Sequence, residues 1–163
     1  MDSIELRPLA AGDAGAVRDL LIHELGATPY AEASAGALTQ ALEAAATGTG
    51  MESRGLIAEH GGEIVGLVLY GVVAGSTGAG KLHAVVVTAS ARLHGVGSHL
   101  CNASVAVLAA HGARFVIAEV ADDPRVAPGR ALLAHTGFHE ESRVPDYFAD
   151  GVALAFLRRD VRT

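Results

Sequence analysis

Basic residues are scarce in this sequence, and lysine almost absent. Lys81 is the only lysine among 163 residues, and the formal net charge is −6. A nucleic-acid-binding domain usually carries a basic patch or stripe, so this composition argues against a nucleic-acid partner. A mildly acidic protein instead suits a cationic or amine substrate.

Cysteine and long apolar runs are scarce as well. Cys101 is the only cysteine, which excludes an internal disulfide and suits a reducing compartment. The longest apolar stretches are well short of a membrane span, and the opening MDSIELRPLA lacks the basic start and apolar run of a signal peptide. We therefore expect a cytoplasmic protein without a membrane partner. The eight histidines show no metal-ligand spacing with Cys101, so we expect no metal site.

What the chain does contain is enough apolar material for one core. Half of the residues are hydrophobic, and the length suits a single domain over residues 1–163. Aromatic residues make up only 4 %, while alanine and glycine are abundant. Alanine fits either face of a helix or strand, which weakens the periodicity that predicts each element.

The order of elements nevertheless predicts a fold class. Apolar patterns and turn residues predict helices at 14–25, after a Ser34 cap, at 98–111 and at 130–136, and strands at 3–10, 54–60, 63–74, 81–88, 113–120, 138–144 and 151–159. Only the two strands that flank the 98–111 helix need to be parallel, through a right-handed crossover. The sequence therefore predicts an α+β fold with a mixed, mostly antiparallel sheet of about seven strands and four helices.

Two glycine-rich loops compete as the phosphate-binding site. The first, GSTGAGKL at 75–82, has the glycine spacing and the lysine of a nucleotide P-loop. Leu82 stands where that motif needs a magnesium-binding hydroxyl, and the next residues favour a strand rather than a helix. We therefore interpret this segment as a flexible hairpin connection, with a nucleotide-binding switch as a remote alternative.

The second loop, RLHGVGSHL at 92–100, lies between a predicted strand and a predicted helix. Gly95 and Gly97 allow the backbone to pass close to a bulky anion, and N–H groups of the first helical turn can converge on it. Ser98 can donate a further hydrogen bond, and Arg92 adds a positive charge that reaches a phosphate. The three-glycine spacing of dinucleotide-binding folds is absent, so we expect a pyrophosphate of another kind.

These residues resemble a known family. The stretch Arg92 to Gly97 is similar to the "[Q/R]-x-x-G-x-[G/A]" signature of the GNAT acyltransferases, and SIELRPLAAGD, GGEIVGLVLY and LLAHTGF resemble other parts of that fold. The resemblance covers most of the chain and implies one GNAT-like domain that uses acetyl-CoA. It implies that the strand before the loop splays from its parallel neighbour. The implied cofactor-binding residues are Val85, Val86 and Val87 for the pantetheine arm, and Arg92, Leu93, His94, Gly95, Val96, Gly97 and Ser98 for the pyrophosphate.

Acetyl transfer to an amine needs a base, because an ammonium group has no lone pair. His83 is the first candidate, and LHAVVV also resembles arylalkylamine N-acetyltransferases, in which a histidine at this position helps to deprotonate the amine. Glu119, on the neighbouring strand, is the second candidate. Each also has a purely structural interpretation, His83 as a packed strand residue and Glu119 as an ordinary strand-end carboxylate.

The sequence departs from the family at the general acid. Leu133 occupies the position where many members have a tyrosine, and Val126 replaces a frequent asparagine. Tyr147, in VPDYFADG, is the alternative candidate acid, unless it only packs over its hairpin or no acid is needed.

Tyr30 and Glu32 lie where the family builds its substrate wall, and either could simply be a surface-loop residue. The sequence thus predicts an N-acetyltransferase that moves an acetyl group to a primary amine, of a small molecule or a peptide, by direct attack. A homodimer is common in such a family. The alternative is a catalytically weak acyl-CoA-binding or sensing domain of the same fold.

Overall fold

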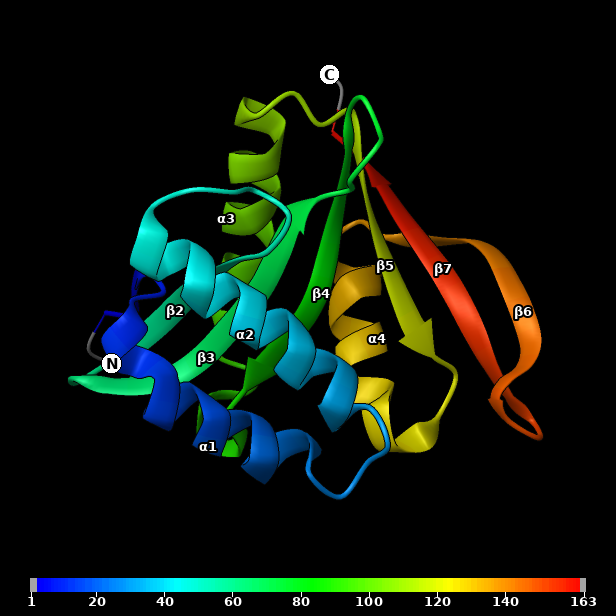
Figure 1. The fold of residues 1–163 in the computed structure, drawn as a ribbon. Coiled ribbons are helices and arrows are strands. Elements are labelled where there is room, and N and C mark those ends of the chain that lie inside the picture. The colour runs from blue at the N-terminus through cyan, green and yellow to red at the C-terminus, as the bar shows by residue number, and fades with distance from the viewer. Residues whose placement is uncertain (1–2, 162–163) are drawn as a thin grey trace.

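The computed structural model describes residues 3–161, and within them the strands form one seven-stranded sheet (Figure 1). The strands are β1 (Glu5–Pro8), β2 (Arg54–His60), β3 (Glu63–Val72), β4 (Ala79–Val87), β5 (Phe115–Ala121), β6 (His139–Ala149) and β7 (Val152–Asp160). Across the sheet they lie in the order β1-β2-β3-β4-β5-β7-β6. Every neighbouring pair is antiparallel except β4 and β5. The predicted α+β fold with one parallel pair is confirmed.

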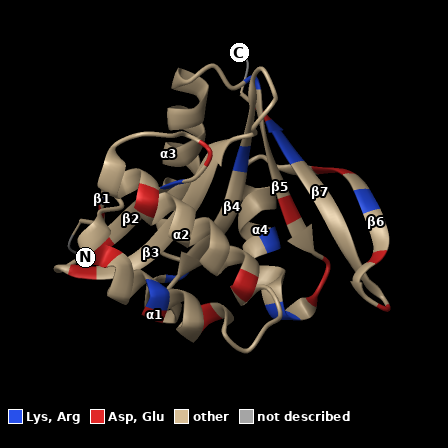
Figure 2. Ribbon diagram, in the orientation of Figure 1, with Lys and Arg blue, Asp and Glu red and all other residues tan. Residues whose placement is uncertain are grey.

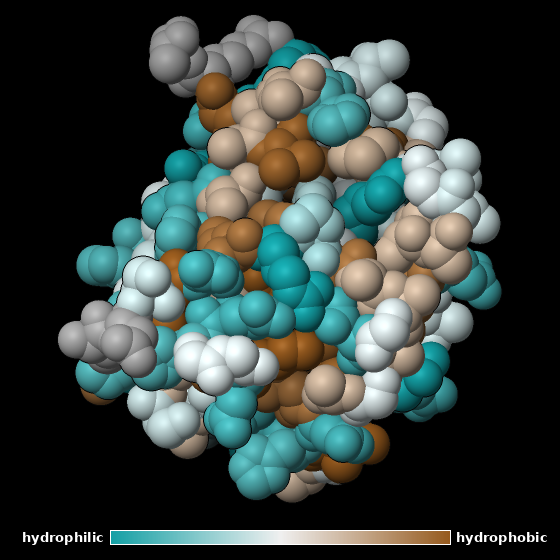
Figure 3. All heavy atoms as spheres, turned by 90° about the vertical axis from the view of Figure 1, so that its left-hand side faces the viewer, coloured by the Kyte–Doolittle hydropathy of each residue, from teal (hydrophilic) through white to brown (hydrophobic). Residues whose placement is uncertain are grey.

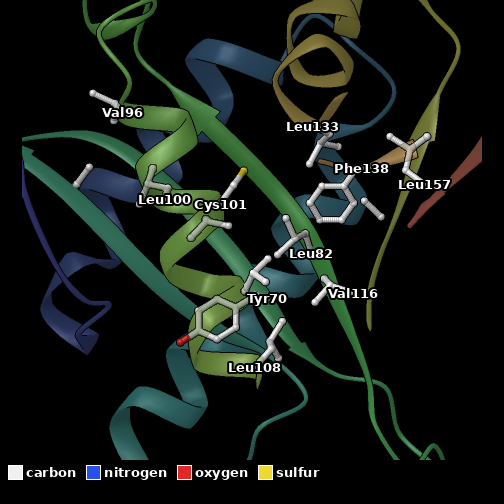
Figure 4. Packing of buried hydrophobic residues seen from close by; sticks show 14 of the residues in the cluster. Tyr70, Leu82, Val96, Leu100, Cys101, Leu108, Val116, Leu133, Phe138 and Leu157 are labelled. Carbon is white, nitrogen blue, oxygen red and sulfur yellow. The ribbon is translucent and has the colours of Figure 1, made fainter. Parts of the chain in front are cut away.

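In the described part of the chain, four α-helices cover the two faces of the sheet. Helices α1 (Ala14–Leu25) and α2 (Ala31–Thr47) lie on one face, and α3 (Val96–Ala110) and α4 (Ala127–His135) lie on the other (Figure 1). Helix α1 buries Val17, Leu20 and Leu21, which share one side of a helix because they are three and four residues apart. On the opposite face, Leu100 and Leu108 of α3 belong to a second buried cluster (Figure 4).

The parallel pair separates partway along its length. Strand β4 pairs with β5 only from Ala79, opposite Phe115, to Leu82, opposite Ala118. Beyond Leu82 it stays paired with β3, while β5 continues along β7 to Ala121. Within the described part of the chain, one edge of β4 is therefore without a strand partner from His83 onward.

The last hairpin differs from the prediction. The sequence predicted a loop at 145–150, but β6 continues to Ala149, and only Asp150 and Gly151 separate it from β7. Between the paired residues Val144–Leu154 and Ala149–Val152, β6 has four residues and β7 has one. The three extra residues make a large, irregular bulge in β6. Pro145 lacks the N–H that a regular ladder needs, and edge strands tolerate such a residue. The predicted loop is thus a bulged, exposed edge strand.

Helices α2, α3 and α4 begin earlier than the sequence indicated, whereas α1 begins at Ala14 as predicted. Helix α2 begins at Ala31, so Ser34 is a buried residue inside the helix rather than its cap. Ala31, Glu32 and Ala33 are good helix formers, which explains the earlier start. Helices α3 and α4 likewise begin at Val96 and Ala127. Among residues 3–161, no helix combines the length and apolar character that crossing a bilayer requires.

Candidate active site

The glycine loop at 92–97 connects the free end of β4 to α3. Gly95 precedes the first helical residue and has φ 79°, a left-handed conformation that side chains disfavour. Among residues 3–161, and leaving aside its two chain neighbours, a Cβ at Gly95 would meet no atom within 4 Å, so the space beside it is open. The first N–H groups of α3 have no partner within the helix, which leaves them available to an anion.

Gly97 has a packing role as well, and its predicted role in cofactor binding stays a prediction. A Cβ there would lie 2.6 Å from the Leu132 side chain of α4. Gly97 is buried in the first turn of α3, so its missing side chain allows α3 and α4 to pack closely. The sequence could not reveal this contact, because it depends on how two helices meet.

The other loop residues differ in exposure. Arg92, Leu93 and His94 are exposed, Ser98 is half-buried and Val96 is buried. Leu93 has φ 65° and a fully exposed side chain. The side chain of Val96 packs in the core, so only its backbone can face a ligand.

Arg92 is held between β4 and α1. Its Nε donates to the backbone oxygen of Val87 at 3.2 Å, and its Nη2 forms an ion pair with the carboxylate of Glu24. The Glu24 side chain is only 7 % exposed. The predicted pyrophosphate arginine is therefore anchored by a carboxylate that the sequence analysis did not single out.

The free edge of β4 offers backbone groups from two of the three predicted valines. Thr88 donates to the oxygen of Val65 at 2.9 Å, and the residues of an antiparallel pair alternate in the side to which they bond. This alternation directs the backbone of Val86 toward β3 and that of Val85 and Val87 toward the gap beside β5. Pantetheine binding by all three valines stays a prediction, and the register favours Val85 and Val87.

His83 lies at the point where β4 leaves β5. The β3–β4 register shifts between Leu69, opposite Ala84, and Tyr70, opposite Leu82, so His83 is the extra residue of a β-bulge. Bulges re-aim side chains and are common next to active sites. Across this bulge, the side chains of β4 therefore do not alternate regularly between the two faces of the sheet.

The imidazole of His83 is oriented by one hydrogen bond. Its Nε2 lies 2.9 Å from the backbone oxygen of Glu52. A carbonyl oxygen only accepts, so Nε2 carries the hydrogen and Nδ1 of the neutral ring keeps a lone pair. Burial lowers the pKa of His83, an effect that Lys81 strengthens and that the Glu52 carbonyl and Glu119 oppose. The ring is therefore neutral near pH 7 and able to accept a proton.

The charge of Glu119 acts on His83, and the Glu119 carboxylate also forms an ion pair. Its Oε1 lies 3.3 Å from Nζ of Lys81. Lys81 lies inside β4, and the loop before it leads into a strand rather than a helix, as the sequence predicted. The lysine of the P-loop-like segment is therefore a strand residue that pairs with Glu119 of β5.

Tyr30 joins three segments that are far apart in the sequence. Its hydroxyl donates to Oδ2 of Asp123 at 2.7 Å, and its ring meets that of Phe148 edge-on, with centroids 5.2 Å apart. Asp123 follows β5 and also accepts from Arg125, which holds the pKa of the Asp123 carboxyl well below its ordinary range. Figure 2 shows further acidic residues around this face, on α2, on β5 and after β5. Asp123 and Phe148 were missed in the sequence, where nothing connects them to Tyr30.

Tyr147 adjoins the aromatic contact of Tyr30 and Phe148, whereas Glu32 lies in a separate pocket. Tyr147 is 58 % exposed, and its ring contacts Phe148. Among the described residues, no hydrogen bond links Tyr147 to His83 or Glu119. Glu32 lines a pocket of about 270 Å³ between α1 and α2, together with Arg18 and Ile22. The structure therefore places Glu32 and the Tyr30 hydroxyl in different surroundings.

Two side chains inside the core are excluded from chemistry by their burial. Leu133, at the position of the family's tyrosine, packs beside Phe138 (Figure 4). Cys101 is fully buried, and burial raises the pKa of its thiol to about 11. A thiol that stays protonated and out of contact with solvent is a poor nucleophile.

The comparisons with known proteins agree with this geometry. The model of the acetyltransferase (GNAT) family matches residues 20–138, more than half of the chain. The chain therefore belongs to the GNAT family and is an N-acetyltransferase of that family. No curated protein sequence matches it.

Solved structures share the fold at low sequence identity. A GNAT-family protein from Desulfovibrio desulfuricans superposes with a TM-score of 0.84 and 21 % identity, over 98 % of this chain and 100 % of the other. The ribosomal-protein-alanine N-acetyltransferase of Brucella melitensis gives 0.74 and 20 %, over 96 % and 99 %. The yncA protein of Salmonella typhimurium, whose structure holds its cofactor acetyl-CoA, gives 0.77 and 16 %, over 99 % and 95 %. At these identities the likeness shows the fold alone.

Proposed function

We propose that the protein transfers an acetyl group from acetyl-CoA to a primary amine by direct attack. The observation that carries this proposal is the free edge of β4, which begins at His83 and ends in the Arg92–Gly97 loop. One continuous surface thus combines backbone groups for a pantetheine arm, a helix N-terminus for a pyrophosphate and an imidazole for proton transfer.

The residues of this surface fit acetyl-CoA. The backbone of Val85 and the N–H of Val87 are placed like those of a strand that lacks a neighbour, while the Val87 oxygen accepts from Arg92. The loop offers open space beside Gly95. Arg92 supplies a positive charge at the same loop. The cofactor would supply an acetyl group already activated as a thioester.

In the proposed reaction, His83 accepts the proton of the amine. The Nδ1 lone pair takes that proton, directly or through water, because Nε2 is committed to the Glu52 carbonyl. The neutral amine nitrogen then forms a bond with the acetyl carbon, its second proton is lost to water, and the carbon–sulfur bond breaks to release a thiolate. Tyr147 is the proposed proton donor to that thiolate, and it lies on the exposed bulge of β6.

The proposed acceptor is a cationic amine. Tyr30 and Phe148 provide aromatic faces, which attract cations, and acidic side chains surround this face (Figure 2). We propose Tyr30 as a residue of the acceptor wall, with Glu32 as a residue of the neighbouring pocket. Whether the acceptor is a small molecule or a peptide, and whether the protein forms a homodimer, stay predictions.

An acceptor screen with acetyl-CoA, read by release of free thiol, tests the proposal. Small amines, polyamines, amino acids and peptides with free N-termini should be compared, each with its N-acetylated form as the control. Thiol release that depends on the free amine supports the transferase. Binding of acetyl-CoA without turnover of any amine would favour the sensing domain instead.

A further inference from the structure

A second pocket lies at the opposite end of α3 from the Arg92–Ser98 loop. It measures about 380 Å³ and includes Val107 and His111, from the C-terminal end of that helix and just beyond it. Its other walls come from the end of β1, from α2 and from the start of β2. Because α3 has 15 residues at about 1.5 Å each, roughly a helix length separates this pocket from the loop. Figure 3 views the molecule from the side of β1 and β2, where apolar atoms show between polar groups.

The hydroxyl of Tyr70 lines this pocket without a partner. Tyr70 is only 5 % exposed, and among residues 3–161 its oxygen makes no hydrogen bond. Figure 4 shows this oxygen pointing away from the hydrophobic cluster that holds the ring. Burial raises the pKa of Tyr70, so the hydroxyl keeps its hydrogen and is a donor. The hydroxyl oxygen is not among the fully buried atoms that lack a partner, so it reaches the open space of the pocket and can donate to a ligand there.

Arg54 gives the pocket a positive charge. Its Nε donates to the backbone oxygen of Gly50, which leaves both Nη groups as donors. Among the described residues Arg54 forms no ion pair, and no carboxylate lines the pocket. The rest of the wall is mostly apolar and includes Met51, Leu56 and Val107.

We propose that this pocket binds a small organic carboxylate between Tyr70 and Arg54. The carboxylate accepts hydrogen bonds from the Tyr70 hydroxyl and the Arg54 guanidinium, a charge-assisted arrangement that planar guanidinium groups favour. The apolar body of the ligand lies against Met51, Leu56 and Val107. A cationic or neutral ligand would leave the charge of Arg54 without compensation. This site is independent of the proposed acetyl transfer.

Phenylacetate is a suitable probe, with phenylacetamide as its uncharged match. We expect phenylacetate to shift the backbone NMR signals of residues around Tyr70 and to bind with a Kd on the order of 1 mM, ordinary for a ligand of about ten heavy atoms. Phenylacetamide should bind about tenfold more weakly or worse. The titration contains neither acetyl-CoA nor an amine, so its failure would leave the proposed transferase untouched.

Variants locate the site. Tyr70→Phe removes one oxygen and keeps the packed ring, and it should weaken phenylacetate about tenfold, since hydrogen bonds to charged groups are among the strong ones. Arg54→Gln should act similarly, whereas Arg143→Gln, the same charge change on β6, should leave the affinity unchanged. Equal affinity for phenylacetamide in the unaltered protein, an unchanged Kd in a folded Tyr70→Phe protein, or displacement of phenylacetate by CoA would each overturn the proposal.

Discussion

Arg92 and Glu24 form an ion pair that connects the proposed pyrophosphate loop to the last turn of α1. Sixty-eight positions separate them in the sequence. The carboxylate is almost buried, while the guanidinium stays partly exposed and also donates to Val87. The charge that we assign to the pyrophosphate is therefore shared with a carboxylate of the protein.

We expect substitutions of Arg92 and Glu24 to have opposite effects on CoA binding. Arg92→Gln should weaken CoA binding about tenfold, because it removes a charge-assisted hydrogen bond. Glu24→Gln should tighten CoA binding about threefold, because it removes a negative charge that competes for Arg92. Calorimetric titration with CoA measures both, and a thermal melt of each variant checks the fold. Weaker binding in a folded Glu24→Gln protein would show that Glu24 positions Arg92 rather than competing for it.

The environment of His83 predicts a pH profile. Burial lowers the pKa of His83, and only the neutral imidazole can act as a base. The rate should therefore rise with pH through a midpoint below the ordinary value of about 6.5 and stay level above it. His83→Gln should lower kcat by about 10²- to 10⁴-fold and abolish this rise, with little change in CoA affinity.

His135→Gln is the matched control, because His135 is exposed at the end of α4. It should leave both kcat and the pH profile as they are. A loss below about fivefold in His83→Gln, with the profile preserved, would make His83 a structural residue and Glu119 the next candidate base.

Gly95 and Gly97 should respond differently to alanine. At Gly95 the left-handed backbone costs about 1–2 kcal/mol for any other residue, but no neighbour obstructs a Cβ. We expect Gly95→Ala to fold with a slightly lower melting temperature and to bind CoA at least about tenfold more weakly. Gly97→Ala should lose about 1–3 kcal/mol of stability, because its Cβ overlaps Leu132. Denaturant unfolding checks both stability losses, and CoA titration separates the two roles, because only Gly95→Ala should lose affinity; equal losses of CoA affinity would contradict this assignment.

The two aromatic residues of the β6 bulge should also differ. If Tyr147 protonates the leaving thiolate, Tyr147→Phe lowers kcat about 10²-fold and leaves KM for the amine nearly constant. Phe148→Ala should instead raise that KM, because it removes the ring that packs against Tyr30. Steady-state kinetics with the best acceptor distinguishes them. An unchanged kcat in Tyr147→Phe would mean that water protonates the thiolate.

Cys101 should be dispensable for the chemistry. Direct attack needs no acyl-enzyme, and a buried thiol with a pKa of about 11 is almost entirely protonated at neutral pH. Cys101→Ala should keep kcat within about twofold while losing about 1–2 kcal/mol of stability from the small cavity it leaves. Loss of turnover in a well-folded Cys101→Ala protein would point to a cysteine-bound intermediate.

The sequence alone determined the order of the elements and, with it, the parallel pair. The apolar strand before Arg92, the glycine loop and the helix that follows it are local patterns, and a strand–helix–strand unit requires parallel strands. The same local patterns identified His83 and the Arg92–Ser98 loop as the candidates, because glycine spacing and strand position are visible within a few residues. Where alanine blurred the periodicity, as at the start of α2, the boundaries were wrong.

Only the tertiary structure decided which distant residues meet. The Glu24 partner of Arg92, the Glu52 carbonyl at His83 and the joining of Tyr30 to Asp123 and Phe148 all depend on strand register and helix packing. The bulge that displaces His83 from regular alternation and the contact that requires a glycine at 97 arise in the same way. Periodicity in a sequence reports which side of its own element a residue occupies, and the partner on that side is chosen when the elements pack.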